Sequence, residues 1–196
     1  MELADLNVNK QYTYADYLLW QFQDRVELLK GKLIKMTPAP LRQHQEVLNT
    51  IDWYLTTYFR GKPCKVYPAP FDVRLPKHAG ATKDNQVYTV VQPDICVVCD
   101  PAKLDRRGCL GAPDLVVEIL SPGNSQVEMN QKYQVYQEAG VREYWLVNYI
   151  DQVVLVYVLN DQGVFIGLPP VTKAQPLVPA IFPEIKIDLD EVFTTD

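Results

Sequence analysis

The sequence has no run of eighteen apolar residues, and its first residues, MELADLNVNKQ, contain no hydrophobic stretch of the kind found in secretory signals. A membrane-spanning helix and a secretory leader both need such a stretch, so we predict neither. Cysteine is also scarce, with four in 196 residues and no spacing that indicates a disulfide framework. Buried free thiols in a reducing compartment are therefore expected, and we predict a cytoplasmic protein without a membrane partner.

An excess of positive charge is missing as well. The chain has 19 Lys and Arg against 24 Asp and Glu, a formal net charge of -5. Non-specific coating of nucleic acid depends on neutralising phosphates, so this charge excludes that class of protein but leaves room for a local basic patch. Two small basic clusters, both more typical of solvated loops than of a binding surface, are Lys103, Arg106 and Arg107, and Lys30, Lys32 and Lys35.

The apolar content of 47% is enough for a substantial core. We expect one domain over residues 1–196, with an N-terminal helix-hairpin extension at about 13–36 and a C-terminal strand extension at about 142–196. Apolar residues recur at helical spacing in some segments and in short strand-like runs in others. This mixture predicts an α/β domain, with a mixed β-sheet flanked by helices.

Three helices are expected: one over 13–23, one after Pro40 with an apolar face from His44 to Tyr58, and one from a capping box of Ser125 and Glu128 to Gly140. Two short strands surround Lys30 and Gly31, and a strand interrupted at Pro68 and Pro70 suits a sheet edge. Residues 76–92 are polar and predict a loop. The remaining strand predictions are 94–100, 114–120, a hairpin of 142–149 with 153–160, and 164–168.

The strand DLVVEIL carries two carboxylates, Asp114 and Glu118, within an apolar run. They share a strand face, but their Cα atoms are roughly 13 Å apart, too far for one small cation. If 94–100 and 114–120 pair antiparallel, Asp94 falls within about a residue of Glu118, and Asp114 falls near Cys99. Two carboxylates held together favour Mg²⁺ or Mn²⁺, which supports phosphodiester hydrolysis. Ordinary solvated positions at strand ends are the alternative, and spacing alone favours that alternative.

Several blocks resemble the Uma-type restriction endonuclease family of the PD-(D/E)XK nuclease superfamily: VELLKGKLIKM, PAPLRQHQ, QPDICVVCD, GAPDLVVEILSP and KYQVYQEAGVREYWLV. The resemblance spans residues 13 to about 160 and implies a restriction-endonuclease-like fold with Mg²⁺-dependent (or Mn²⁺-dependent) cleavage of DNA. By position, Asp94 matches the superfamily aspartate and Glu118 the acid that follows it. Glu27 matches an additional active-site carboxylate, and the resemblance makes all three candidate metal ligands.

The superfamily lysine would stand two residues after the acid, where this chain has Leu120. The resemblance implies that Lys132, on the following helix, takes its place as a catalytic residue that orients water or stabilises charge on the phosphate. The alternative is a surface pair of Lys132 with Glu128, four residues apart on a helix. Other departures are Lys32, Glu128 and Asn148, and none of these removes a presumed ligand.

Other patterns are weaker. Cys96 and Cys99 are spaced within a strand so that they face opposite sides, which disfavours zinc. His44 fits a core histidine better than an active-site residue. Tyr133, Tyr136 and Trp145 are interpreted as core or interface aromatics. SPGNS lacks the spacing of a serine-hydrolase nucleophile.

The chain is thus expected to be a DNA endonuclease. The rival hypotheses are a non-catalytic DNA-binding or protein-interaction module of the same fold, and a phosphoesterase or RNA nuclease with the same carboxylates. A homodimer is expected because two-fold symmetry suits duplex cleavage.

Overall fold

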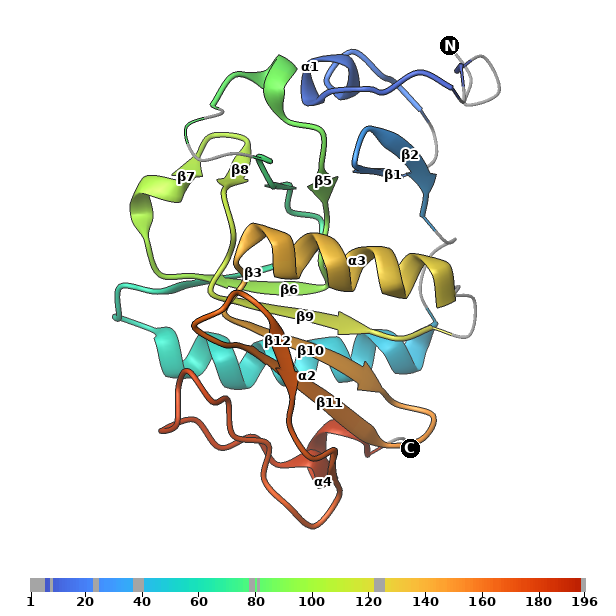
Figure 1. Ribbon diagram of the computed structural model, residues 1–196. Coiled ribbons are helices and arrows are strands. Elements are labelled where there is room, and N and C mark those ends of the chain that lie inside the picture. Colours follow the sequence, from blue (N-terminus) through green and yellow to red (C-terminus); the bar gives the residue numbers. More distant parts are fainter. Residues whose placement is uncertain are drawn as a thin grey trace.

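The computed structural model, shown in Figure 1, describes residues 6–7, 9–22, 25–36, 41–77, 80, 82–121 and 126–194, without the side chains of 126–128. Two β-sheets and two long helices form the framework of this part of the chain. The predicted α/β class, a mixed sheet flanked by helices, is confirmed. The capping box of Ser125 and Glu128 lies outside the described residues.

The seven-stranded sheet carries the main core. Its strand order is β12-β11-β10-β9-β6-β3, with β13 also paired to β11. The bounds are β3 Lys65–Pro68, β6 Ile95–Val98, β9 Leu115–Ile119, β10 Glu143–Asn148, β11 Val153–Leu159, β12 Phe165–Gly167 and β13 Val171–Thr172. The predicted β10–β11 hairpin is confirmed, and β9 and β10 pair in parallel through the crossover helix α3.

The six-stranded sheet has the order β2-β1-β5-β4-β8-β7. The bounds are β1 Val26–Leu29, β2 Lys32–Lys35, β4 Val73–Arg74, β5 Val90–Val91, β7 Leu104–Asp105 and β8 Gly108–Leu110. The predicted hairpin around Lys30 and Gly31 is confirmed as β1 and β2. The strand interrupted at Pro68 and Pro70 is β3, the outermost strand of the seven-stranded sheet, so its predicted edge position is confirmed. After β3 the chain crosses into the six-stranded sheet.

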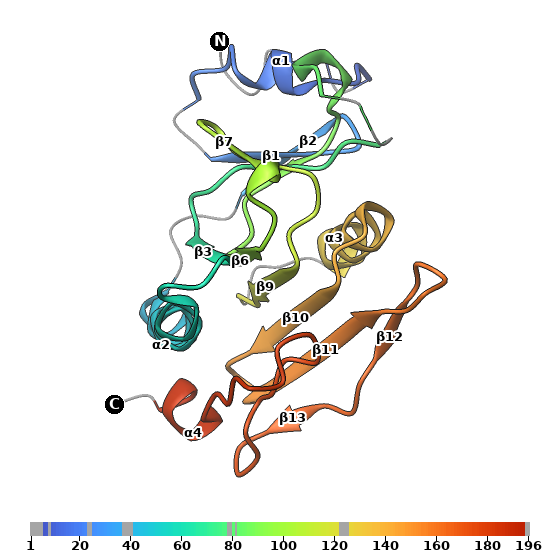
Figure 2. The same cartoon turned by 90° about the vertical axis from the view of Figure 1, so that its left-hand side faces the viewer.

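Two helices cover opposite faces of the seven-stranded sheet, as Figure 2 shows for α2 (Arg42–Phe59) and α3 (Gln126–Ala139). Strand residues alternate between the two faces. Ile95 and Val97 pack with α2, whereas Cys96 and Val98 pack with α3. The predicted second and third helices are therefore confirmed, and Gly140 follows α3 with a φ of 87°. Among the described helices, none is long and apolar enough to cross a bilayer.

The predicted helix over 13–23 is confirmed only at its start. The Thr13 amide donates to Asp16 Oδ2 at 2.9 Å, as a capping arrangement requires. However, α1 spans only Tyr14–Tyr17, followed by a turn at residues 18–19. Leu18 and Leu19 are 44% and 81% exposed, so the residues that follow α1 are not buried against the domain. Without that burial, nothing extends the helix.

The loop prediction for 76–92 is wrong at its end, because β5 lies there. Strands β7 and β8 were missed as well, in the segment between β6 and β9. All three are two or three residues long and lack their own apolar pattern, so pairing with neighbours across the sheet decides their conformation. Gly108 in β8 allows a close approach, since a Cβ there would lie 2.2 Å from the Asp72 carbonyl oxygen.

The prediction of four free thiols is wrong for two of them. Cys64 and Cys99 form a disulfide that joins residues 35 positions apart. Their positions extend the β3–β6 register by one residue beyond Lys65 and Val98, so a pairing between distant strands creates the bond, and sequence spacing does not reveal it. Cys96 and Cys109 are buried free thiols, as expected. Because Cys99 is bonded to Cys64, it is not available to a zinc site with Cys96.

Candidate active site

The β6–β9 ladder brings Asp94 and Glu118 together. These strands pair antiparallel with Ile95 opposite Val117, as the sequence predicts. Continuing the register by one residue places Asp94 opposite Glu118, and residues opposite each other in an antiparallel pair share a face of the sheet. The other end of the ladder also agrees with expectation, since Asp114 Oδ2 accepts a hydrogen bond of 2.8 Å from the Cys99 amide.

Glu118 is held through one oxygen. Lys132 Nζ lies 3.0 Å from Glu118 Oε1, and the Tyr136 hydroxyl donates to the same atom at 2.6 Å. Both donors come from α3, where residues four apart share a face. No described group donates to Glu118 Oε2, so this oxygen is left to bind something else.

Asp94 is also held through one oxygen. Asp94 Oδ2 accepts from the Ile119 amide at 2.7 Å, and His44 Nε2 lies 3.3 Å from the same atom. His44 stands in the first turn of α2 and is 4% exposed. The structure thus places His44 beside the candidate active site. The sequence favours the other interpretation, a core histidine. Within the described part of the chain, Asp94 Oδ1 receives no donor.

Glu27 reaches the site from the other sheet. It lies on β1 and is only 1% exposed. Its Oε2 is 3.1 Å from Lys132 Nζ, and its Oε1 accepts from the Gln92 amide at 2.8 Å. Lys132 therefore bridges two buried carboxylates, one from each sheet. The two carboxylates offset the cost of burying the Lys132 ammonium. The alternative, a surface pair with Glu128, would leave Lys132 in solvent.

The charges of this cluster shift the pKa values of its members. Burial raises the pKa of Glu118 to about 7; Lys132 opposes this shift, and Asp94 and Glu27 add to it. Burial disfavours a charged lysine, but the attraction of Glu118 and Glu27 outweighs it and raises the pKa of Lys132 above its usual value. Lys132 therefore stays protonated and can act as a cation or donor, but not as a base.

The oxygens suit a hard divalent cation, although they do not form a complete cage. Among the described residues, no group of three His, Cys, Asp or Glu side chains could hold a metal ion. Mg²⁺ typically takes only one or two carboxylates and completes its shell with water and substrate phosphates. Asp94 and Glu118, each with one oxygen that no described group occupies, match that donor set. Glu27 instead faces the Lys132 ammonium.

Sequence comparison gives a family for this arrangement. The Uma2 family, described as "Putative restriction endonuclease", matches residues 14–190. The chain belongs to the Uma2 family. The resemblance predicted from the sequence blocks is therefore confirmed, and it extends beyond residue 160.

Two further comparisons found similar proteins. An uncharacterised protein of Synechocystis sp. (strain ATCC 27184 / PCC 6803 / Kazusa) is 24% identical over 151 residues, which cover 76% of this chain and 74% of that protein. A crystal structure described as a "putative nuclease belonging to DUF820", from Anabaena variabilis ATCC 29413, superposes with a TM-score of 0.70. That match is 21% identical and covers 92% of this chain and 97% of the other, so it shows the shared fold.

The candidate site contains residues that sequence reasoning missed. Tyr136 is predicted to be a core or interface aromatic, yet its hydroxyl contacts Glu118. The available signal is its position four residues after Lys132 on one helix. Gln92, two residues before Asp94, links Glu27 to Asp72 through its amide and through Nε2, which lies 2.9 Å from Asp72 Oδ1. No periodic pattern marks Gln92, because its role depends on contacts between the two sheets.

The raised pKa of Glu118 predicts a pH dependence of stability in the metal-free Uma2 protein. Between pH 4.5 and about 7, folded Glu118 keeps a proton that the unfolded chain has lost. The free energy of unfolding should therefore fall as pH rises through this window, by up to about 3 kcal/mol. Urea unfolding at pH 5 and pH 7.5, with EDTA, measures the fall. Glu118→Gln should remove it, and an identical dependence in both proteins would contradict the assignment.

Proposed function

We propose that this Uma2 chain hydrolyses DNA phosphodiester bonds with Mg²⁺ or Mn²⁺ as cofactor. The observation that carries the proposal is the pairing of Asp94 and Glu118 on adjacent strands, with Lys132 bonded to Glu118 from α3. Family membership supports the nuclease class. The Anabaena variabilis structure is described as a nuclease, but that description applies to that protein, so we argue cleavage by this chain from its own side chains.

Asp94 and Glu118 would hold the ion through Oδ1 and Oε2. When bound, the ion would polarise a phosphoryl oxygen and lower the pKa of a water ligand. His44 and the Ile119 amide keep Asp94 oriented, and Tyr136 does the same for Glu118. Fixed ligand orientations of this kind support affinity and reactivity.

Lys132 would act on the phosphate side of the site. An ammonium has three donors, and two are directed at Glu27 and Glu118, which leaves one for a phosphate oxygen or the attacking water. A positioned cation stabilises the charge that develops in phosphoryl transfer. We propose that Glu27 holds Lys132 in place. A direct contact between Glu27 and the ion or its water is the other role that the family resemblance implies.

Cleavage of supercoiled plasmid tests this function. Nicking should require Mg²⁺ or Mn²⁺, stop with EDTA, and fall by at least about 100-fold in Asp94→Asn, which keeps the side-chain shape. Asp161→Asn, an exposed acid in a turn, serves as the matched control. Parallel assays with single-stranded DNA and RNA identify the substrate class.

Binding of plasmid without cleavage in any divalent ion would favour the non-catalytic module. Equal cleavage by Asp94→Asn would remove Asp94 from the chemistry. Preferential cleavage of RNA would assign the same carboxylates to an RNA nuclease.

The homodimer and the cytoplasmic location stay predictions. A two-fold dimer would present two sites to one duplex. Sedimentation equilibrium with and without duplex DNA measures the mass directly, and a monomer under both conditions would rule the dimer out.

A further inference from the structure

The Cys64–Cys99 disulfide lies at an accessible edge of the fold. Cys64 directly precedes β3, the outermost strand of the seven-stranded sheet on that side, and Cys99 directly follows β6. Neither cysteine is fully buried, whereas Cys96 and Cys109 are each 0% exposed. A disulfide at an exposed edge can be reached by a thiol, and disulfides of cytoplasmic proteins are mostly reversible.

A surface cavity of about 260 Å³ lies beside one of the two bonded cysteines. It is lined by Thr56, Phe59, Arg60, Gly61, Cys64, Lys65 and Val66. Cys64 belongs to this lining and Cys99 does not. The lining contains two cations, Arg60 and Lys65, both exposed, and no carboxylate. Such a cavity favours a small molecule that carries negative charge.

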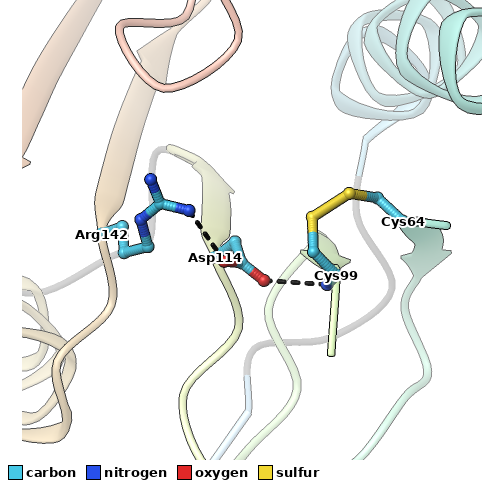
Figure 3. Close-up of a disulfide and its surroundings, with 4 residues drawn as sticks. All are labelled: Cys64, Cys99, Asp114 and Arg142. Carbon is cyan, nitrogen blue, oxygen red and sulfur yellow. Dashed lines mark hydrogen bonds and ion pairs between the residues drawn. A yellow bond between two sulfur atoms is a disulfide. The ribbon is translucent and has the colours of Figure 1, made fainter. Parts of the chain in front are cut away.

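The Cys99 side of the disulfide carries an ion pair and no excess of positive charge. Figure 3 shows Arg142, Asp114 and Cys99 in a row, with Cys64 at the end remote from Asp114. Asp114 Oδ2 accepts from the Cys99 amide, and its Oδ1 lies 3.2 Å from Arg142 Nη1. A negatively charged thiolate that approached Cys64 would meet Arg60 and Lys65, whereas one that approached Cys99 would meet the Asp114–Arg142 ion pair, which has no net charge.

We propose that Cys64 is a thiol-exchange site for a small carboxylate-bearing thiol that binds in this cavity. The thiolate attacks Cys64 Sγ and forms a mixed disulfide, while the Cys64–Cys99 bond breaks and Cys99 leaves with the electron pair and takes a proton from solvent. A second thiol molecule then attacks the ligand sulfur, releases the oxidised ligand dimer and frees Cys64. In total, two thiols are oxidised and the protein disulfide is reduced to two thiols.

Breaking the Cys64–Cys99 bond by thiol exchange would loosen the β3–β6 pair, and this pair leads to Asp94. The β3–β6 ladder runs from the disulfide to the pair Pro68 and Ile95, and the Ala69 amide then donates to the Asp94 carbonyl oxygen at 2.9 Å. Opening a crosslink that spans 35 residues should lower the melting temperature, by roughly 5 to 15 °C for a chain of this size. This inference does not depend on nuclease activity.

Glutathione is the probe for the test. The wild-type protein, treated with reduced and then oxidised glutathione, is mapped by mass spectrometry under native conditions. The expected adduct is on Cys64, with Cys96 and Cys109 unmodified. Cys99→Ser should form the same adduct with oxidised glutathione, and Cys64→Ser should react at least about tenfold more slowly at Cys99.

Charge provides the matched control. Arg60→Ser combined with Lys65→Ser should slow reduction by glutathione, which carries two carboxylates besides its thiolate, about three- to tenfold, and should slow reduction by mercaptoethanol, which carries no carboxylate, by less. Alkylation of Cys64 and Cys99 in the untreated, air-exposed protein would show that they do not form a disulfide, and an adduct on Cys99 would place the attack elsewhere. Equal slowing with both thiols would show that the cavity does not select charge. Each of these three results would overturn the proposal.

Discussion

Lys132→Met is expected to slow DNA cleavage by about 10² to 10³ and to lower the free energy of unfolding by about 3 to 5 kcal/mol. Methionine keeps much of the length of lysine but removes the ammonium that lies between Glu27 and Glu118. Two buried carboxylates would then face each other without a cation, which accounts for the loss of stability. The missing donor at the phosphate accounts for the loss of rate.

Urea unfolding and plasmid nicking measure the two effects. Lys186→Met, at an exposed position, is the control and should change neither. Adding Glu27→Gln to Lys132→Met should recover part of the stability but none of the rate, because it removes one uncompensated charge. A stability loss below about 0.5 kcal/mol in Lys132→Met would indicate a solvated surface lysine.

Glu118→Gln is expected to reduce cleavage by at least about 10³, since it removes several kcal/mol of interaction with the ion. In contrast to Lys132→Met, it should not destabilise the metal-free protein at pH 7.5. The glutamine removes a carboxylate that burial already disfavours, and Lys132 keeps Glu27 as a partner. Circular dichroism and urea unfolding, beside plasmid nicking, separate the two properties.

Glu138→Gln is the matched control, because this glutamate lies on α3, the helix that carries Lys132, but is exposed and paired with Lys30. It should cleave at the wild-type rate. Full activity in Glu118→Gln would exclude Glu118 from the mechanism, and unfolding of that variant would assign it a structural role.

The placement of Asp94 and Glu118 could be predicted because it depends on local rules. If two apolar strands pair antiparallel with level ends, the positions of their acids decide which acids meet, and β6 and β9 pair in this way. The ends of α2 and the C-terminal end of α3 followed from apolar spacing and from Gly140. Lys132 followed from family resemblance, and its burial between two carboxylates removes the surface-pair alternative.

The contacts that were missed depend on the packing of distant segments. Tyr136, His44 and Gln92 acquire their roles because α3, α2 and the six-stranded sheet meet at the end of β6 and β9. The short strands β5, β7 and β8 exist only as partners of other strands. The Cys64–Cys99 bond likewise depends on the β3–β6 pairing. Tyr136 and His44 lie at helical spacing, but Gln92, the short strands and the disulfide carry no periodic signal, so single-sequence reasoning does not find them.

A crystal structure of the wild-type protein with Mn²⁺, read by anomalous scattering, decides whether Asp94 and Glu118 form a metal site. We expect one ion peak bound by the carboxylates of both Asp94 and Glu118, with Lys132 still in contact with Glu118. A peak bound by neither carboxylate, or no peak at a saturating Mn²⁺ concentration, would contradict this expectation.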